Sequence, residues 1–86
     1  MSKYNKLLGQ ILRGVSDANI NFEKLRELLV HIGFTERIKS SHHIYLKEGI
    51  EEIINIQSKN GKGKPYQIKQ IRNIIVKYKL GVKEDE

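Results

Sequence analysis

The stretch Phe34–Gln57, FTERIKSSHHIYLKEGIEEIINIQ, decides the fold class of this 86-residue chain. β-Branched residues are frequent in it, and Ile44 and Leu46 alternate with Tyr45 and Lys47, which is the period of a strand. Short strands separated by turn residues predict an antiparallel meander. We expect its three strands at Phe34–Lys39, His42–Lys47 and Glu51–Gln57.

Alternation in the second strand predicts the face on which each histidine lies. Ser40–Ser41 forms the expected turn, so the strand starts at the histidine pair. Its parity predicts His42 on the helix-facing side with Ile44, and His43 on the outer face with Tyr45.

Helical periodicity flanks this stretch on both sides. Apolar residues recur at helical spacing over 3–13, and a second helix is expected from an N-cap at Asn21 to a C-cap at Gly33. Pro65 suits the first position of a third helix over 66–80. Helices before and after a small antiparallel sheet predict an α+β domain, with the helices on one sheet face.

Composition limits the organisation and the class of protein. We expect an N-terminal helical extension at 1–14, one domain at 15–82 and an acidic tail at 83–86. The chain has no cysteine, so disulfides and thiolate metal sites are excluded. With no apolar run of membrane-spanning or signal-peptide length, we expect a cytoplasmic protein that does not span a membrane.

The net charge of +6 is concentrated in one part of the sequence. Residues 1–52 are nearly neutral, whereas residues 53–83 contain eight basic and no acidic side chains. This distribution predicts a polyanionic partner, but charge alone leaves nucleic acid, an acidic protein and a membrane surface open. The basic residues are Lys59, Lys62, Lys64, Lys69, Arg72, Lys77, Lys79 and Lys83.

Few groups could carry chemistry. Adjacent strand residues diverge, so His42 and His43 do not have the spacing of metal ligands, and we expect no metal and no cofactor. The Gly- and Lys-rich loop 58–64 lacks the P-loop pattern, although its backbone and lysines could hold a phosphate at the start of a helix. A histidine beside a tight turn is either a general acid–base or an ordinary surface or core-edge residue.

The same residues carry a family resemblance. GFTERIKSSHHIYLKEGIEEIINIQ (33–57) followed by KPYQIKQIRNIIVKYKLG (64–81) resembles the HicA family, the toxins of two-gene modules whose antitoxin is HicB. With the SDANI segment at 16–20, the resemblance extends over about residues 16–81. It implies a fold like the double-stranded-RNA-binding domain, and a toxin–antitoxin ribonuclease that cleaves mRNA without a metal and is neutralised by a HicB-like protein.

The resemblance also implies residue roles. The family's single essential histidine falls on His42, with His43 as the second candidate, and Ser40 replaces the glycine usual in the turn. The histidine would act as acid or base on the RNA 2′-OH, while basic and aromatic residues hold the RNA. The RNA-binding candidates are Arg37, Lys39, Tyr45, Lys59, Lys62, Lys64, Tyr66, Lys69 and Arg72.

Two alternatives to a ribonuclease stay open from the residues. One is a non-catalytic RNA-binding module in which His42 contacts a phosphate or a 2′-OH. The other is a protein-interaction module whose basic face binds an acidic partner.

Overall fold

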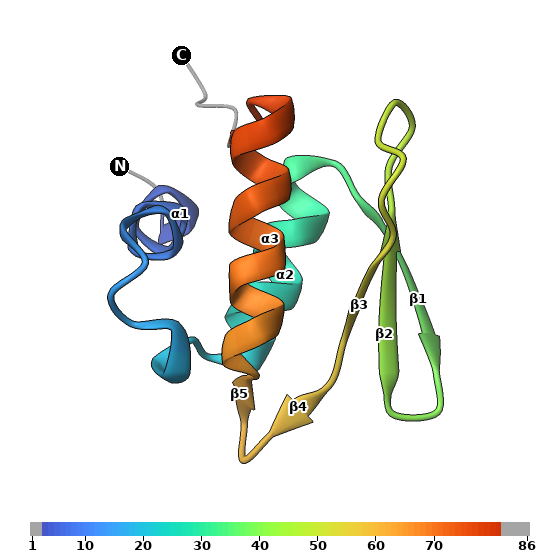
Figure 1. Ribbon diagram of the computed structural model, residues 1–86. Helices are drawn as coiled ribbons and strands as arrows, with labels where there is room; N and C mark the ends of the chain where they lie inside the picture. Colours follow the sequence, from blue (N-terminus) through green and yellow to red (C-terminus); the bar gives the residue numbers. More distant parts are fainter. Residues whose placement is uncertain (1–2, 82–86) are drawn as a thin grey trace.

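A computed structural model describes residues 3–81, which form three α-helices, a three-stranded antiparallel sheet and a small hairpin (Figure 1). The expected α+β class is confirmed, whereas the acidic tail at 83–86 lies outside the described residues. The elements in chain order are α1 (Lys3–Arg13), the 3-10 turn η1 (Asp17–Asn19), α2 (Phe22–Ile32), β1 (Thr35–Lys39), β2 (His42–Leu46), β3 (Ile54–Ile56), β4 (Ser58–Lys59), β5 (Lys62–Gly63) and α3 (Pro65–Tyr78).

The helices form layers beside one face of the sheet. Helices α2 and α3 lie between the sheet and α1, which packs on the side of them that faces away from the sheet (Figure 1). Leu7 and Ile11 of α1 are buried in the same core as Leu25 and Ile71. The apolar stripe predicted over 3–13 is therefore covered by this chain itself except at Leu12, which is 43% exposed.

The helix boundaries follow the expected capping residues, with one exception. Asn21 caps α2, its side-chain oxygen accepting a hydrogen bond from the Lys24 backbone N–H at 2.9 Å. Gly33 ends α2 with φ 123°, and Pro65 opens α3. Helix α3 ends at Tyr78 rather than at Leu80, because Lys79 adopts the left-handed conformation with φ 54°.

The sheet has the strand order β1-β2-β3, with both pairs antiparallel. The register aligns Glu36 with Tyr45 and Tyr45 with Ile54. Strand β3 starts at Ile54 rather than at Glu51, and its buried Ile54 and Ile56 identify the face that meets the helices.

The expected assignment of the β2 side chains to the two faces of the sheet is wrong. Tyr45 is fully buried, and the His43 side chain is 15% exposed and meets the Phe22 ring edge-on at 5.0 Å. His42 is exposed on the outer face, with Leu46. The physical reason is that the Tyr45 hydroxyl donates to Glu36 Oε2 at 2.5 Å, so the aromatic ring is buried with its polar atom satisfied.

A half-buried ionic network forms on this inner face. Arg26 of α2 donates to both carboxylate oxygens of Glu36, from Nε at 2.9 Å and from a terminal nitrogen at 3.2 Å. These hydrogen bonds lower the pKa of Glu36 to about 2, and Glu36 in turn raises the pKa of Arg26. Burial raises the pKa of Tyr45, as does its hydrogen bond to Glu36. The network fastens β1 to α2.

Two tight turns shape the end of the molecule near the start of α3. In the β1–β2 turn, Ser40 has φ 57°, a left-handed value, and no positive φ occurs at Ser41. In the β4–β5 turn, Asn60 and Gly61 both have positive φ, 54° and 78°, as a type I′ turn requires. The segment 58–64 is thus a hairpin rather than the expected loop.

Backbone hydrogen bonds join this hairpin to the segment that precedes α2. The N–H of Gly63 donates to the Ile20 carbonyl at 3.0 Å, and the N–H of Phe22 donates to the Gly61 carbonyl at 2.9 Å. A Cβ on Gly63 would lie 3.1 Å from side-chain carbons of Leu25 and Ile68, so glycine allows the close approach. The lysine-bearing hairpin is therefore held against the core.

Candidate functional site

His42 is the exposed histidine at the start of β2, and its ring is oriented by a neighbouring strand. Its Nδ1 lies 3.2 Å from Oδ1 of Asn55, which is on the exposed side of β3. An amide oxygen only accepts hydrogen bonds, so this contact favours the tautomer with the proton on Nδ1 and a lone pair on Nε2. An imidazole held in this tautomer can accept a proton at Nε2.

Gln57 connects this histidine to a lysine at the start of α3. The Gln57 amide nitrogen donates to Ser41 Oγ at 3.1 Å and lies 3.4 Å from His42 Nε2. Its oxygen accepts a hydrogen bond from Lys64 Nζ at 3.3 Å. The imidazole of His42 and the ammonium group of Lys64 are thus separated only by the carboxamide of Gln57.

The hairpin and the first turn of α3 bring further candidates to the same end of the molecule. One hollow is lined by Ser58, Lys59, Lys64, Pro65 and Tyr66. A second is lined by Ala18, Lys59, Asn60, Lys62, Gly63, Lys64 and Pro65. The β4–β5 turn and the N-terminal end of α3 lie at one edge of the fold, together with the β1–β2 turn (Figure 1). This concentration of positive charge is suited to a phosphate backbone.

Two more candidates lie on the outer face of the sheet beside His42. Lys39 is the direct partner of His42 in the β1–β2 register, and Arg37 is opposite Ile44. Both are exposed, and directly opposed residues of an antiparallel pair point to the same side. The basic surface therefore continues from the hairpin onto the sheet.

Three sequence candidates are not available to a ligand as expected. Tyr45 is fully buried, which corrects the expectation that it stacks on a base. Arg72 donates to both carboxylate oxygens of Asp17 and to the Ile11 carbonyl, so it fastens α3 to the N-terminal region. His43 faces the core, and its buried Nδ1 makes no hydrogen bond to another described residue.

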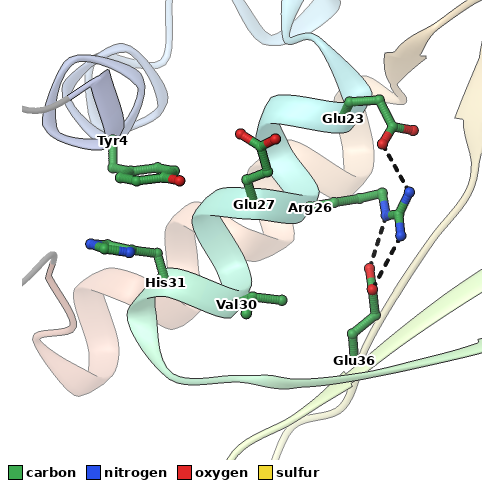
Figure 2. A pocket seen from close by; sticks show the side chains of 7 residues that line it. All are labelled: Tyr4, Glu23, Arg26, Glu27, Val30, His31 and Glu36. Atoms are coloured by element: carbon green, nitrogen blue, oxygen red, sulfur yellow. Dashed lines mark hydrogen bonds and ion pairs between the residues drawn. The ribbon is translucent and has the colours of Figure 1, made fainter.

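A separate groove of about 410 Å³ contains none of the candidate residues (Figure 2). It lies between α1, α2 and β1, and its wall includes Tyr4 stacked on His31 with ring centroids 4.1 Å apart. Arg26 points between Glu23 and Glu36 and is neutralised by both (Figure 2). The groove is acidic on balance, so it does not suit a polyanion.

Sequence reasoning missed Asn55 and Gln57, the two amides that contact His42. A signal was present, because Ile54 and Ile56 alternate with Asn55 and Gln57 and thereby place both amides on the face opposite the core. Which outer-face residue they would meet depends on the strand register.

Comparisons with protein-family models, curated proteins and solved structures found no match to this chain. Over residues 3–81, no helix combines the length and apolar character that crossing a bilayer requires. In that same part of the chain, no three acidic or histidine side chains are grouped so that they could hold a metal ion.

Proposed function

We propose that this protein is an endoribonuclease in which His42 is the catalytic acid–base. The observation that carries the proposal is the His42 arrangement, in which Asn55 contacts Nδ1 of an exposed ring and the Gln57 carboxamide links Nε2 to Lys64. His31, which stacks on Tyr4, and His43, which faces the core, lack these features.

The reaction uses a nucleophile that RNA itself provides. His42 Nε2 removes the proton of a 2′-OH, and the 2′-oxygen attacks the adjacent phosphorus. The bond from phosphorus to the 5′-oxygen breaks, and the protonated imidazole returns its proton to that leaving oxygen. The products are a 2′,3′-cyclic phosphate and a 5′-hydroxyl.

Lysines at the hairpin and at the start of α3 stabilise the charge of the reacting phosphate. Lys64 is linked to His42 through the Gln57 carboxamide. Lys59 and Lys62 extend the positive surface, and Arg37 and Lys39 continue it over the sheet. The RNA runs along this edge with its scissile phosphate beside His42.

The resemblance to HicA proteins gives the biological setting of this proposal. The order α2-β1-β2-β3-α3 supports a fold like the double-stranded-RNA-binding domain, with β4–β5 inserted before the last helix. The ribonuclease is the toxin of a toxin–antitoxin module and cleaves mRNA in the cytoplasm. A HicB-like antitoxin would neutralise it by covering the basic edge around His42.

Metal-free cleavage of RNA tests the proposal. The purified chain is incubated with end-labelled mRNA in EDTA, and the product ends are identified. We expect cyclic phosphate ends, and His42→Ala should reduce the rate at least about 100-fold because it removes the proton acceptor. His31→Ala is the matched control, since it removes an exposed histidine outside the site.

Several outcomes would overturn the assignment. Unchanged cleavage by a folded His42→Ala chain, with loss of cleavage in His43→Ala, would move the catalytic role to His43. Products with 3′-hydroxyl ends would exclude attack by the 2′-oxygen. Binding of RNA without cleavage would favour the RNA-binding module, and salt-sensitive binding of an acidic protein but not of RNA would favour the protein-interaction module.

A further inference from the structure

A third hollow, next to the basic edge, has the composition of a nucleobase site rather than of a phosphate site. Its volume is about 330 Å³, which is at the small end of the usual range for ligand pockets. It follows α3 away from the hairpin, and Glu52, from the segment before β3, also lines it. The lining residues are Glu52, Tyr66, Lys69, Gln70, Asn73, Ile74 and Lys77.

Tyr66 is shared between this hollow and the lysine-rich one beside it. It is 66% exposed, so its ring is open to solvent. An exposed ring next to lysines offers a stacking surface for an unpaired base. Lys64 lines the lysine-rich hollow and reaches His42 through Gln57, so the stacking surface lies beside the proposed catalytic edge.

The hollow also contains two amide side chains with free hydrogen-bonding capacity. Gln70 and Asn73 are exposed on α3, and the structure of residues 3–81 gives neither side chain a hydrogen-bond partner. An amide presents both a donor and an acceptor, which is the pattern needed to read the edge of a base. Lys69, which directly precedes Gln70 in sequence, adds a positive charge.

Charge determines which part of a nucleotide enters the hollow. The carboxylate of Glu52 is held at the far end by Lys77 Nζ at 2.8 Å and by the Tyr78 hydroxyl at 2.5 Å. These contacts lower the pKa of Glu52 to about 2, and the ion pair with Lys77 leaves Lys69 as the other charged residue of the lining. The neighbouring hollow is lined by Lys59 and Lys64 and by no carboxylate, so a phosphate is favoured there and the base is favoured here.

We propose that this hollow binds one unpaired RNA base, stacked on Tyr66 and read by Gln70 and Asn73, and that it determines which sequence is cut. The inference rests on the proposed ribonuclease function, because it assigns the specificity of that same site. We therefore expect substitutions on α3 to change the preferred RNA sequence, and substitutions at the start of β2 to change catalysis.

RNA binding by the uncut complex is the first test. In a His42→Ala background, fluorescein-labelled octamers of adenylate, cytidylate and uridylate are titrated with protein and followed by anisotropy. Tyr66→Ala should weaken binding about 5- to 150-fold, the effect of losing one stacked base, whereas Tyr66→Phe should retain it. Lys69→Ala should weaken all three octamers equally and reduce the salt dependence.

The amide variants test recognition of the base. Gln70→Ala or Asn73→Ala should change the ratio of affinities among the three octamers by about 5-fold or more. Gln10→Ala, the same change on α1, is the matched control and should change none of them. In an otherwise unsubstituted chain, the amide variants should shift the cut sites.

The outcomes distinguish this inference from the function on which it rests. Unchanged affinity ratios in both amide variants, with cut sites unmoved, would overturn the base site while metal-free cleavage by the unsubstituted chain still supports the ribonuclease. Tight RNA binding by Tyr66→Ala would also overturn it. Failure of the unsubstituted chain to bind or cut any RNA would overturn both.

Discussion

Each face of the sheet carries a polar cluster. The two clusters differ in how closely their hydrogen-bonding side chains are paired and in how exposed they are. On the inner face, Glu36 receives hydrogen bonds from Arg26 and from Tyr45, and its side chain is only 20% exposed. On the outer face, His42 is exposed, and its contacts with Asn55 and Gln57 are 3.2 and 3.4 Å long.

This difference indicates which cluster stabilises the fold and which can bind a ligand. In a network with short hydrogen bonds, the donors and acceptors are already paired with each other and are not available to a substrate. Breaking such a network leaves a half-buried charge without its partner. A cluster with long contacts and open lone pairs contributes little to stability and can exchange its partners for a substrate. Substitutions on the two faces should therefore separate stability from activity.

The largest effect is expected at Glu36. Glu36→Ala leaves Arg26 and the Tyr45 hydroxyl without their acceptor, and it should lower the free energy of unfolding by about 3 kcal/mol in urea at pH 7. Cleavage should persist at a temperature where the variant is folded. Glu23→Ala removes the exposed partner of Arg26 and should cost less than about 1 kcal/mol. Equal losses of unfolding free energy in Glu36→Ala and Glu23→Ala would contradict a stabilising role of the inner network.

Acid should weaken the inner network in a defined range. The folded pKa of Glu36, about 2, is below its ordinary value of 4.5, so its stabilisation is complete above about pH 4.5 and is lost as the pH falls toward 2. The difference in unfolding free energy between the unsubstituted chain and Glu36→Gln should shrink over that range. A difference in unfolding free energy that stays constant down to pH 2 would show that Glu36 does not have this lowered pKa.

An intermediate effect, on activity alone, is expected at Asn55. Asn55→Ala frees the His42 ring to rotate and should lower kcat about 10- to 100-fold with little change in KM. The unfolding free energy should change by less than about 0.5 kcal/mol, because Asn55 is exposed. A fall in stability that matches the fall in activity would mean that Asn55 is only structural.

The smallest effect is expected at the turn between β1 and β2. Ser40→Gly should stabilise the protein by about 1 kcal/mol, because glycine adopts the left-handed φ of 57° without steric cost. Ser41→Gly is the control and should give no gain, since Ser41 has no positive φ. Cleavage should be retained by Ser40→Gly, which tests whether the serine alters the placement of His42.

Periodicity and capping residues predicted the helices and the existence of the three strands. The face of β2 was predicted wrongly because Ile44 and Leu46 are more apolar than Tyr45 and His43, whereas burial followed the partner available to the tyrosine hydroxyl. The hairpin at 58–64 was missed although Asn60-Gly61 is the favoured pair for a two-residue hairpin turn.

The candidate site was predictable in part. His42 was selected by its position after a turn and by resemblance, and the lysines by their charge. Its contacts with Asn55 and Gln57, and the link through Gln57 to Lys64, involve residues 13 to 22 positions further along the sequence, so only the folded register shows them. The role of Arg72 depends equally on distant contacts, since Asp17 lies 55 positions away.

The pairing of the hairpin with the segment before α2 has a consequence for biosynthesis. Lys62 reaches Asn19 across 43 positions, and Gly63 and Ile20 share a backbone hydrogen bond. Contacts between positions so far apart in sequence form late in folding, because closing the long intervening loop costs conformational entropy. A chain emerging from the ribosome therefore has no assembled lysine edge until the hairpin has left the exit tunnel, so the timing of folding would itself delay activity.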